Sequence, residues 1–339
     1  MSKQLSPNIS VIIPVYKPPL NYFKACLDSL RNQTMSNVEF LIVFDGNDEA
    51  LYSFCKNYQK NDPRFKLYVQ PHLGVSATRN FGIKQSSGEY ITFVDADDWI
   101  ESKCCQSTYD FAKENDSDIV LFDYIPVDGQ NERKEYADRA ISKFSSEEIT
   151  ALQEQTIALT DHKYISVVST WGKIIKKSLV SNNAISFPTN IHIAVDRPFM
   201  FRVYLFAKNI SYINDVFYNY NKVEGSISYK KYYNKDIKLL DYLIEIKKIS
   251  NKFPQQIGKQ AFILLEDAWN YFYFNKKDNQ SYLCDIKYLC GVIQSQSFQD
   301  LISETTLQDY PLIKKIELFL LKHKITILLW IRTFKRMLF

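Results

Sequence analysis

Short apolar runs alternate with helical stretches along the first 125 residues of the chain. The apolar runs have the length of strands and lie at residues 9–15, 38–44, 65–69, 90–94 and 119–122. A helical pattern follows each of the first four, beginning near residues 20, 49, 77 and 101. Strands that alternate with helices form parallel βαβ units, so we expect an α/β fold with a mostly parallel, doubly wound sheet. In such sheets ligands bind at the carboxyl ends of the strands.

Three carboxylates follow the fourth predicted strand within one short turn, Asp95-Ala96-Asp97-Asp98. Carboxylates this close repel one another unless a cation lies between them, and a hard divalent ion with oxygen ligands is the usual one. Asp97 or Asp98 could instead cap the helix that begins near residue 101, which is a common role for Asp. The turn by itself leaves both readings open.

The rest of the chain is organised differently. Residues 126–228 begin with a polar surface excursion and continue as a mixed segment, whereas residues 229–339 carry periodic Leu, Ile, Phe and Tyr positions with few turn signals. That periodicity predicts a helical C-terminal region. A composition with 46% hydrophobic residues, 9 Gly and 11 Pro excludes a disordered protein. We therefore expect three regions, 1–125, 126–228 and 229–339.

The cysteines and the N-terminus favour a cytoplasmic protein. The six cysteines include no CxxC pair and no His at ligand spacing, so neither a zinc site nor a disulfide framework is expected. The first residues lack the charged segment and the apolar run of a signal peptide. No apolar run approaches the roughly 20 residues that span a bilayer.

The C-terminal residues 313–339 are basic, with seven Lys or Arg and one Glu, although the net charge of the whole chain is only +4. A body that is near neutral argues against a nucleic-acid partner. On a helical wheel over 312–339 the charged residues share one broad face, and the opposite face carries Ile316, Phe319, Ile327, Trp330 and Phe334. A basic amphipathic helix of this kind fits a peripheral anchor on the inner face of the cell membrane. The alternative is a helix docked on the protein's own body or on a partner.

Four motifs follow one another in the first 100 residues. They are Ile12-Ile-Pro14-Val-Tyr16, Glu39-Phe-Leu-Ile-Val-Phe-Asp45-Gly46, Gly74-Val-Ser-Ala-Thr-Arg79-Asn80-Phe-Gly82 and Gly88-Glu-Tyr-Ile-Thr-Phe-Val-Asp95-Ala-Asp97-Asp98. In this order and spacing they closely resemble the pattern of glycosyltransferase family 2. The resemblance covers roughly residues 8–228 and implies a GT-A type nucleotide-diphospho-sugar transferase fold. It also implies that residues 1–125 bind the nucleotide-sugar and that residues 126–228 bind the acceptor and carry the catalytic base.

The resemblance assigns donor-binding roles to residues at the strand ends. Pro14, Val15 and Tyr16 would lie against the base and ribose, where an aromatic ring and a fixed φ suit a flat ligand. Asp45 would accept a hydrogen bond from the base N–H, which favours uracil. Arg79 and Asn80 would help to hold the nucleotide, although Arg79 could equally be a structural ion-pair partner.

The Asp95-Ala96-Asp97 segment matches the DxD motif of the family. By that resemblance Asp95 would contact the ribose or a metal-bound water, and Asp97 would ligate Mn²⁺ or Mg²⁺. The metal would neutralise the diphosphate as it leaves. Asp98 would support the metal ligands or cap the following helix.

The resemblance also places the catalytic base, which deprotonates the acceptor hydroxyl, at Asp196. Val195 stands where the family commonly has Glu, a departure that implies altered acceptor binding or lost activity. Asp196 could also be a helix N-cap ahead of Pro198, because Pro is favoured in the first turn.

Three further residues match auxiliary positions of the family. Trp171 and Lys173 resemble a Trp-x-Lys segment, and an indole there would contact the acceptor sugar, although a core Trp is the alternative. Lys222 would close over the diphosphate. His72 and His192 are isolated, and we assign neither a role.

The resemblance to this family implies an inverting glycosyltransferase of the hexosyl or N-acetylhexosaminyl type. It would move a sugar from a UDP-sugar to a saccharide or lipid-linked acceptor during synthesis of a bacterial surface polysaccharide, such as a capsule. A nucleotidyltransferase would show a Gly-rich phosphate loop after the first strand, and this chain has none. A non-catalytic sugar-nucleotide-binding member of a polysaccharide-assembly complex is supported only by Val195.

Overall fold

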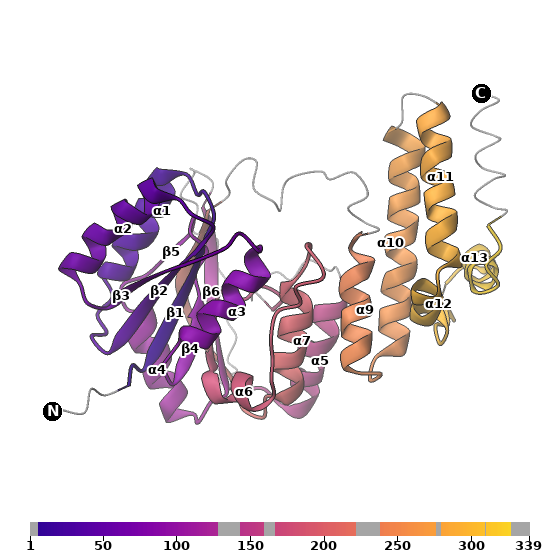
Figure 1. Cartoon of the computed structure of the whole chain (residues 1–339). Coiled ribbons are helices and arrows are strands. Elements are labelled where there is room, and N and C mark those ends of the chain that lie inside the picture. Colours follow the sequence, from indigo (N-terminus) through magenta and orange to yellow (C-terminus); the bar gives the residue numbers. More distant parts are fainter. Residues whose placement is uncertain are drawn as a thin grey trace. The chain divides into compact units, whose positions relative to one another are not determined.

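The computed structural model describes residues 6–127, 143–158, 167–221, 238–275, 279–308 and 310–326 (Figure 1). The chain divides into two compact units. The first comprises Met1–Thr156 with Thr160–Lys230, and the second comprises Ile157–Leu159 with Lys231–Phe339. The boundary expected at residue 125, and the roles of the halves on either side of it, stay predictions.

The first unit contains a sheet whose described strands have the order β3-β2-β1-β4-β7-β6-β8-β5. They are β1 (Ile9–Val15), β2 (Val38–Asp45), β3 (Phe65–Gln70), β4 (Tyr90–Phe93), β5 (Trp99–Ile100), β6 (Ile119–Val127), β7 (Lys173–Lys176) and β8 (Ile210–Asn221). The pairings from β3 to β4 and between β6 and β8 are parallel, whereas β7 is antiparallel to both neighbours and β5 is antiparallel to β8. The α/β fold with a mostly parallel sheet is confirmed, and the antiparallel pairings all lie in its second half.

Helices cover both faces of the parallel half. The described helices that follow these strands are α1 (Leu20–Arg31), α2 (Glu49–Asn61), α3 (Val75–Gln85), α4 (Cys104–Glu114), α5 (Ser146–Ile157), α6 (Lys177–Asn182) and α7 (Asp196–Phe206). α1 and α2 lie on one side of the sheet and α3 on the other (Figure 1). Right-handed crossovers produce this arrangement when the strand order reverses direction. β2 is consequently buried along its whole length.

Two residues of the sequence motifs hold this layer together. Glu39 of β2 is buried and accepts a hydrogen bond from the Ser87 backbone N–H at 2.6 Å, and its second oxygen pairs with Lys66 Nζ at 2.6 Å. Gly82 of α3 lies so close to β1 that an added Cβ would be 2.4 Å from Ile12 Cγ2. Part of the motif pattern therefore reflects helix–sheet packing.

The second unit is helical, as predicted. Its described helices are α9 (Leu240–Ile249), α10 (Pro254–Asn275), α11 (Asn279–Gln294), α12 (Gln296–Ile302) and α13 (Leu312–Lys322). α10 packs against α9, α11 and α12. Within the described ranges, no helix has both the length and the apolar character needed to cross a bilayer. The amphipathic helix predicted over 312–339 is described only as far as residue 326, so Ile327, Trp330 and Phe334 lie outside the described residues.

Candidate active site

The predicted site residues gather at one edge of the sheet. β2, β1 and β4 are adjacent and parallel, so their carboxyl ends point the same way. Val15 ends β1, Asp45 ends β2 and Asp95 follows β4 by two residues. The donor-binding residues expected from the first, second and fourth motifs therefore share this edge.

Asp45 organises the loop between β3 and α3. Its carboxylate is buried and accepts hydrogen bonds from the backbone N–H groups of Leu73 at 2.8 Å and of Gly74 at 3.1 and 3.2 Å, while His72 Nδ1 lies 2.8 Å away. Gly74 has a φ of +89°, in the left-handed region that favours glycine. The carboxylate thus fixes the loop, and its contact with a base stays a prediction.

An exposed aromatic pair borders a hollow at the same edge. The rings of Tyr16 and His72 stack with centroids 4.5 Å apart and planes 12° apart. The hollow has a volume of about 540 Å³, including the part open to solvent, and its lining includes both rings together with Asp45, Gly46 and Asp48. A flat ring system can stack here beside carboxylate and backbone groups. Sequence reasoning assigned no role to His72, although its position just after the third predicted strand places it at this edge.

Arg79 connects the donor-side and acceptor-side motifs. Its buried guanidinium donates from Nη2 to Asp95 Oδ1 at 3.1 Å and from Nη1 to Asp196 Oδ1 at 2.6 Å. The Arg79 Cζ also lies 5.4 Å from the centroid of the Phe187 ring. Asn80, the next residue, exchanges two hydrogen bonds with the Phe187 backbone, at 2.8 and 2.9 Å. In this structure both residues of the third motif hold other protein groups, and their contact with a nucleotide stays a prediction.

Asp97 and Asp98 differ in exposure, because Asp97 is half-buried and Asp98 is not accessible to solvent. Asp98 is fully buried and accepts hydrogen bonds from the Tyr218 hydroxyl at 2.5 Å and from the Asn221 N–H at 2.7 Å. Burial, with a contribution from Asp95, raises the pKa of the Asp98 carboxyl to about 8. α4 begins at Cys104 without a side-chain cap, so the reading of Asp97 or Asp98 as its cap is wrong.

The surroundings of Asp97 fit a divalent cation. Burial and the nearby Asp95 carboxylate raise the pKa of Asp97 to about 6, and no cationic side chain among the described residues offsets that shift. Bringing a positive ion to this carboxylate would relieve the cost of ionising it. Over the described residues no three potential ligands cluster. Mg²⁺ is commonly held by one or two carboxylates, with substrate phosphates completing its coordination.

Asp196 is the first residue of α7. Val195 occupies the N-cap position, and Pro198 is the third helical residue, so the reading of Asp196 as the N-cap is wrong. Burial raises the pKa of the Asp196 carboxyl, and the guanidinium of Arg79 offsets part of that shift. Val195 itself is buried. Asp196 therefore combines partial burial with a cationic partner, and its role as the catalytic base stays a prediction.

The two auxiliary residues of the Trp-x-Lys segment lie in the interior. Trp171 stacks on Tyr218, with ring centroids 4.7 Å apart, and also on Tyr220 at 5.4 Å. The buried Lys173 Nζ donates to the Trp171 carbonyl at 2.9 Å. Burial lowers the pKa of Lys173 to about 7, and Asp196 partly offsets this effect. Acceptor contacts by either residue stay predictions, and Lys222 lies outside the described residues.

The comparisons with known proteins identify the family of the chain. Residues 10–207 match the family model described as glycosyl transferase family 2. The putative glycosyltransferase EpsH of Bacillus subtilis is 33% identical over 224 residues, which cover 63% of this chain and 61% of that protein. Glycosyltransferase GlyG of Streptococcus pneumoniae is 31% identical over 66% of this chain and 73% of its own length. The chain thus spans less than two thirds of EpsH, and it matches only 31% of the length of glycosyltransferase GlyA of Streptococcus pneumoniae.

A solved structure supports the fold. The crystal structure of S. aureus TarS 1-349 superposes with a TM-score of 0.63 over 94% of this chain and 88% of that chain, at 21% identity. This likeness confirms the predicted GT-A type fold. The family model covers more than half of the sequence, and the chain therefore belongs to glycosyl transferase family 2.

Proposed function

We propose that the protein is an inverting glycosyltransferase that transfers a sugar from a UDP-sugar to a saccharide or lipid-linked acceptor. The observation that carries the proposal is the pair of ion pairs made by Arg79. One guanidinium holds Asp95, on the donor side, beside Asp196, the candidate base. A glycosyl transfer needs these two functions within one sugar ring of each other.

The names of related proteins support the choice of donor and product. Structures of S. aureus TarS 1-349 are described in complex with UDP and with UDP-GlcNAc. Relatives at 36% and 29% identity are named poly(ribitol-phosphate) beta-glucosyltransferase and poly(ribitol-phosphate) beta-N-acetylglucosaminyltransferase. These relatives support a hexosyl or N-acetylhexosaminyl donor and a place in the synthesis of a cell-surface polymer.

The residues of the site support a single displacement. Asp196 would take the proton of the acceptor hydroxyl as its oxygen attacks the anomeric carbon, and the bond between that carbon and the diphosphate oxygen would break. Attack from the face opposite the leaving group inverts the anomeric configuration. Tyr16 and His72 would stack on the uracil, and the loop held by Asp45 would border it. Asp97 would hold Mn²⁺ or Mg²⁺, which supplies positive charge for the departing diphosphate.

The same proposal places the reaction at the inner face of the cell membrane, as a peripheral protein. A lipid-linked acceptor would be met there, and the basic character of residues 313–339 suits an anionic lipid surface.

The decisive experiment presents the purified protein with a panel of UDP- and GDP-sugars, with and without Mn²⁺. We expect binding and slow hydrolysis of a UDP-sugar that depend on the metal. Indifference to every donor and to the metal would overturn the proposal. Tight donor binding without turnover on any acceptor would instead favour a non-catalytic binding protein.

A further inference from the structure

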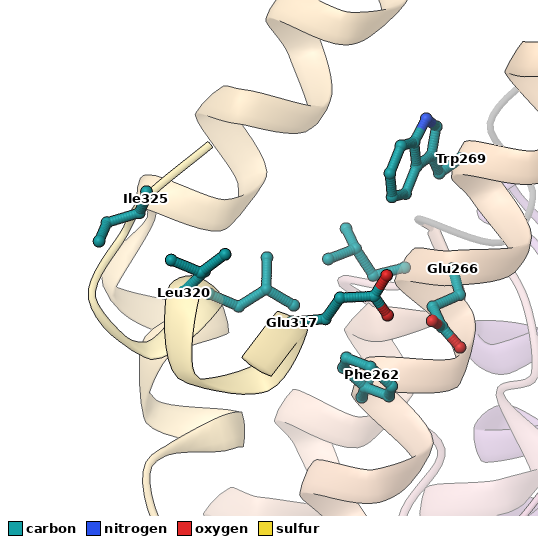
Figure 2. A pocket seen from close by; sticks show the side chains of 8 residues that line it. Phe262, Glu266, Trp269, Glu317, Leu320 and Ile325 are labelled. Carbon is teal, nitrogen blue, oxygen red and sulfur yellow. The ribbon is translucent and has the colours of Figure 1, made fainter. Parts of the chain in front are cut away.

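Within the second unit, α13 packs through the charged residues Lys314 and Glu317 and through Leu318. Glu317 is buried, and Lys314 Nζ forms ion pairs with Glu266 of α10 and, at 3.3 Å, with Glu317. Figure 2 shows the Glu266 and Glu317 carboxylates facing the same apolar pocket, between Phe262 and Trp269. The side of α13 that faces the interior of the second unit therefore combines the ion-paired Lys314 and Glu317 with the buried Leu318.

The opposite side of α13 is apolar and open to solvent. Leu312, Ile313, Ile316 and Phe319 are exposed by 72%, 60%, 47% and 57%. Residues 312, 316 and 319 follow the i, i+4, i+7 spacing of one helical face, and residue 313 borders it. We call these four side chains the α13 outer face. A water-soluble helix normally carries polar residues on the side that faces solvent.

The sequence predicts either a membrane anchor or a helix docked on the protein's own body, and the structure of α13 is compatible with both at once. Docking on the second unit uses Lys314, Glu317 and Leu318, so it leaves the α13 outer face available. Large apolar patches exposed in this way mark surfaces that bind a membrane or another molecule.

The charges around the patch decide between those occupants. Lys315 and Lys324 are exposed, and they lie at the side and at the C-terminal end of the α13 outer face. A second copy docked symmetrically on the same face would bring these lysines toward their own equivalents, and like charges repel. Anionic lipid headgroups would instead pair with them. The sequence continues beyond residue 326 with Arg332, Lys335 and Arg336, which adds to the same charge.

We propose that the α13 outer face rests on an anionic lipid bilayer, with its four apolar side chains below the headgroups and the lysines among the phosphates. The ion pair of Lys314 with Glu266 attaches α13 to α10. It therefore determines which face of α13 is turned toward the bilayer. This names the surface for the membrane contact that the proposed function includes. Its test needs no sugar nucleotide, so its failure would leave sugar transfer untouched.

The test is co-sedimentation of the full chain with vesicles of phosphatidylcholine alone or mixed with equimolar phosphatidylglycerol. We expect binding to the mixed vesicles, weakened by salt. The double variant Ile316→Ser with Phe319→Ser should bind about tenfold more weakly or worse, because two apolar side chains lose their burial in lipid. The matched control is Tyr288→Ser, which removes another exposed aromatic ring of this unit, 46% exposed on α11, and should bind as the wild type does.

A second measurement does not depend on the double variant folding. In Phe319→Trp, the new indole should be quenched by brominated lipids in the mixed vesicles. Absence of quenching would overturn the proposal. So would equal binding by the wild type and a folded double variant, or a wild type that ignores vesicles and forms a dimer that the double variant abolishes.

Discussion

Arg79 Nη1 and Asp196 Oδ1 lie 2.6 Å apart, although 116 residues separate the two in the chain. The same guanidinium reaches Asp95 at 3.1 Å. Each carboxylate would repel the other in a half-buried site, and the cation between them offsets that repulsion. We therefore expect Arg79 to act as a positioning residue, because its two ion pairs join the loop after β4 to the start of α7.

Loss of Arg79 should change the pH profile of sugar transfer. Burial raises the pKa of the Asp196 carboxyl, and the charge of Arg79 offsets part of that rise. Arg79→Gln should therefore raise the pKa further. The base must be ionised to act, and the acid limb of kcat/KM should move to higher pH by on the order of one unit or more. Arg79→Lys should restore part of the shift.

Arg64→Gln is the matched control for that profile. Arg64 is also ion-paired, to Asp62 at 2.7 Å, but it binds the carbonyls of residues 31, 33 and 35 away from the site. Its loss should lower the thermal midpoint without moving the acid limb. An equal pH shift in both variants would show that Arg79 acts through stability alone.

Asp196→Asn should separate donor binding from transfer. The amide keeps the size of the side chain but cannot take a proton, so transfer should fall by a factor of about 100 or more. Binding of the UDP-sugar, measured by calorimetry, should stay within a few-fold of the wild type. Transfer at the wild-type rate would remove Asp196 from the mechanism.

The adjacent carboxylates Asp97 and Asp98 should respond differently to replacement by Ala. Asp97→Ala should abolish the effect of Mn²⁺ on UDP binding with little change in stability, because its carboxylate has no side-chain partner among the described residues. Asp98→Ala leaves the Tyr218 hydroxyl and the Asn221 N–H without an acceptor. It should cost about 1–3 kcal/mol per orphaned group in the free energy of unfolding. Loss of the Mn²⁺ effect in Asp98→Ala alone would reverse the assignment.

The parts of the fold and the site that could be predicted from the sequence are the parallel strands and the motif residues at their carboxyl ends. The alternation of strands and helices in the first 125 residues fixed the parallel half of the sheet, and the motif order indicated the family. The pairing of Arg79 with Asp196 could not be predicted, since it depends on how α7 returns to the sheet. Strand β5 has two residues, too few for any periodicity to appear. The stack of Tyr16 on His72 also needs three-dimensional adjacency, because β1 and β3 are separated by β2 in the sheet.

Gly82 of α3 and Gly291 of α11 should respond to alanine with opposite signs. At Gly82 the added Cβ would lie 2.4 Å from Ile12 Cγ2, so α3 would have to move away from β1. Overpacking of this kind costs about 1–3 kcal/mol. At Gly291 in α11 no atom lies within 4 Å of the added Cβ, and alanine should stabilise the helix by about 0.5–1 kcal/mol. Because α3 follows the loop held by Asp45, Gly82→Ala should also weaken UDP binding, whereas Gly291→Ala should leave it unchanged. Urea unfolding and calorimetry on both variants would check these signs, and a neutral Gly82→Ala would show that α3 is free to shift on the sheet.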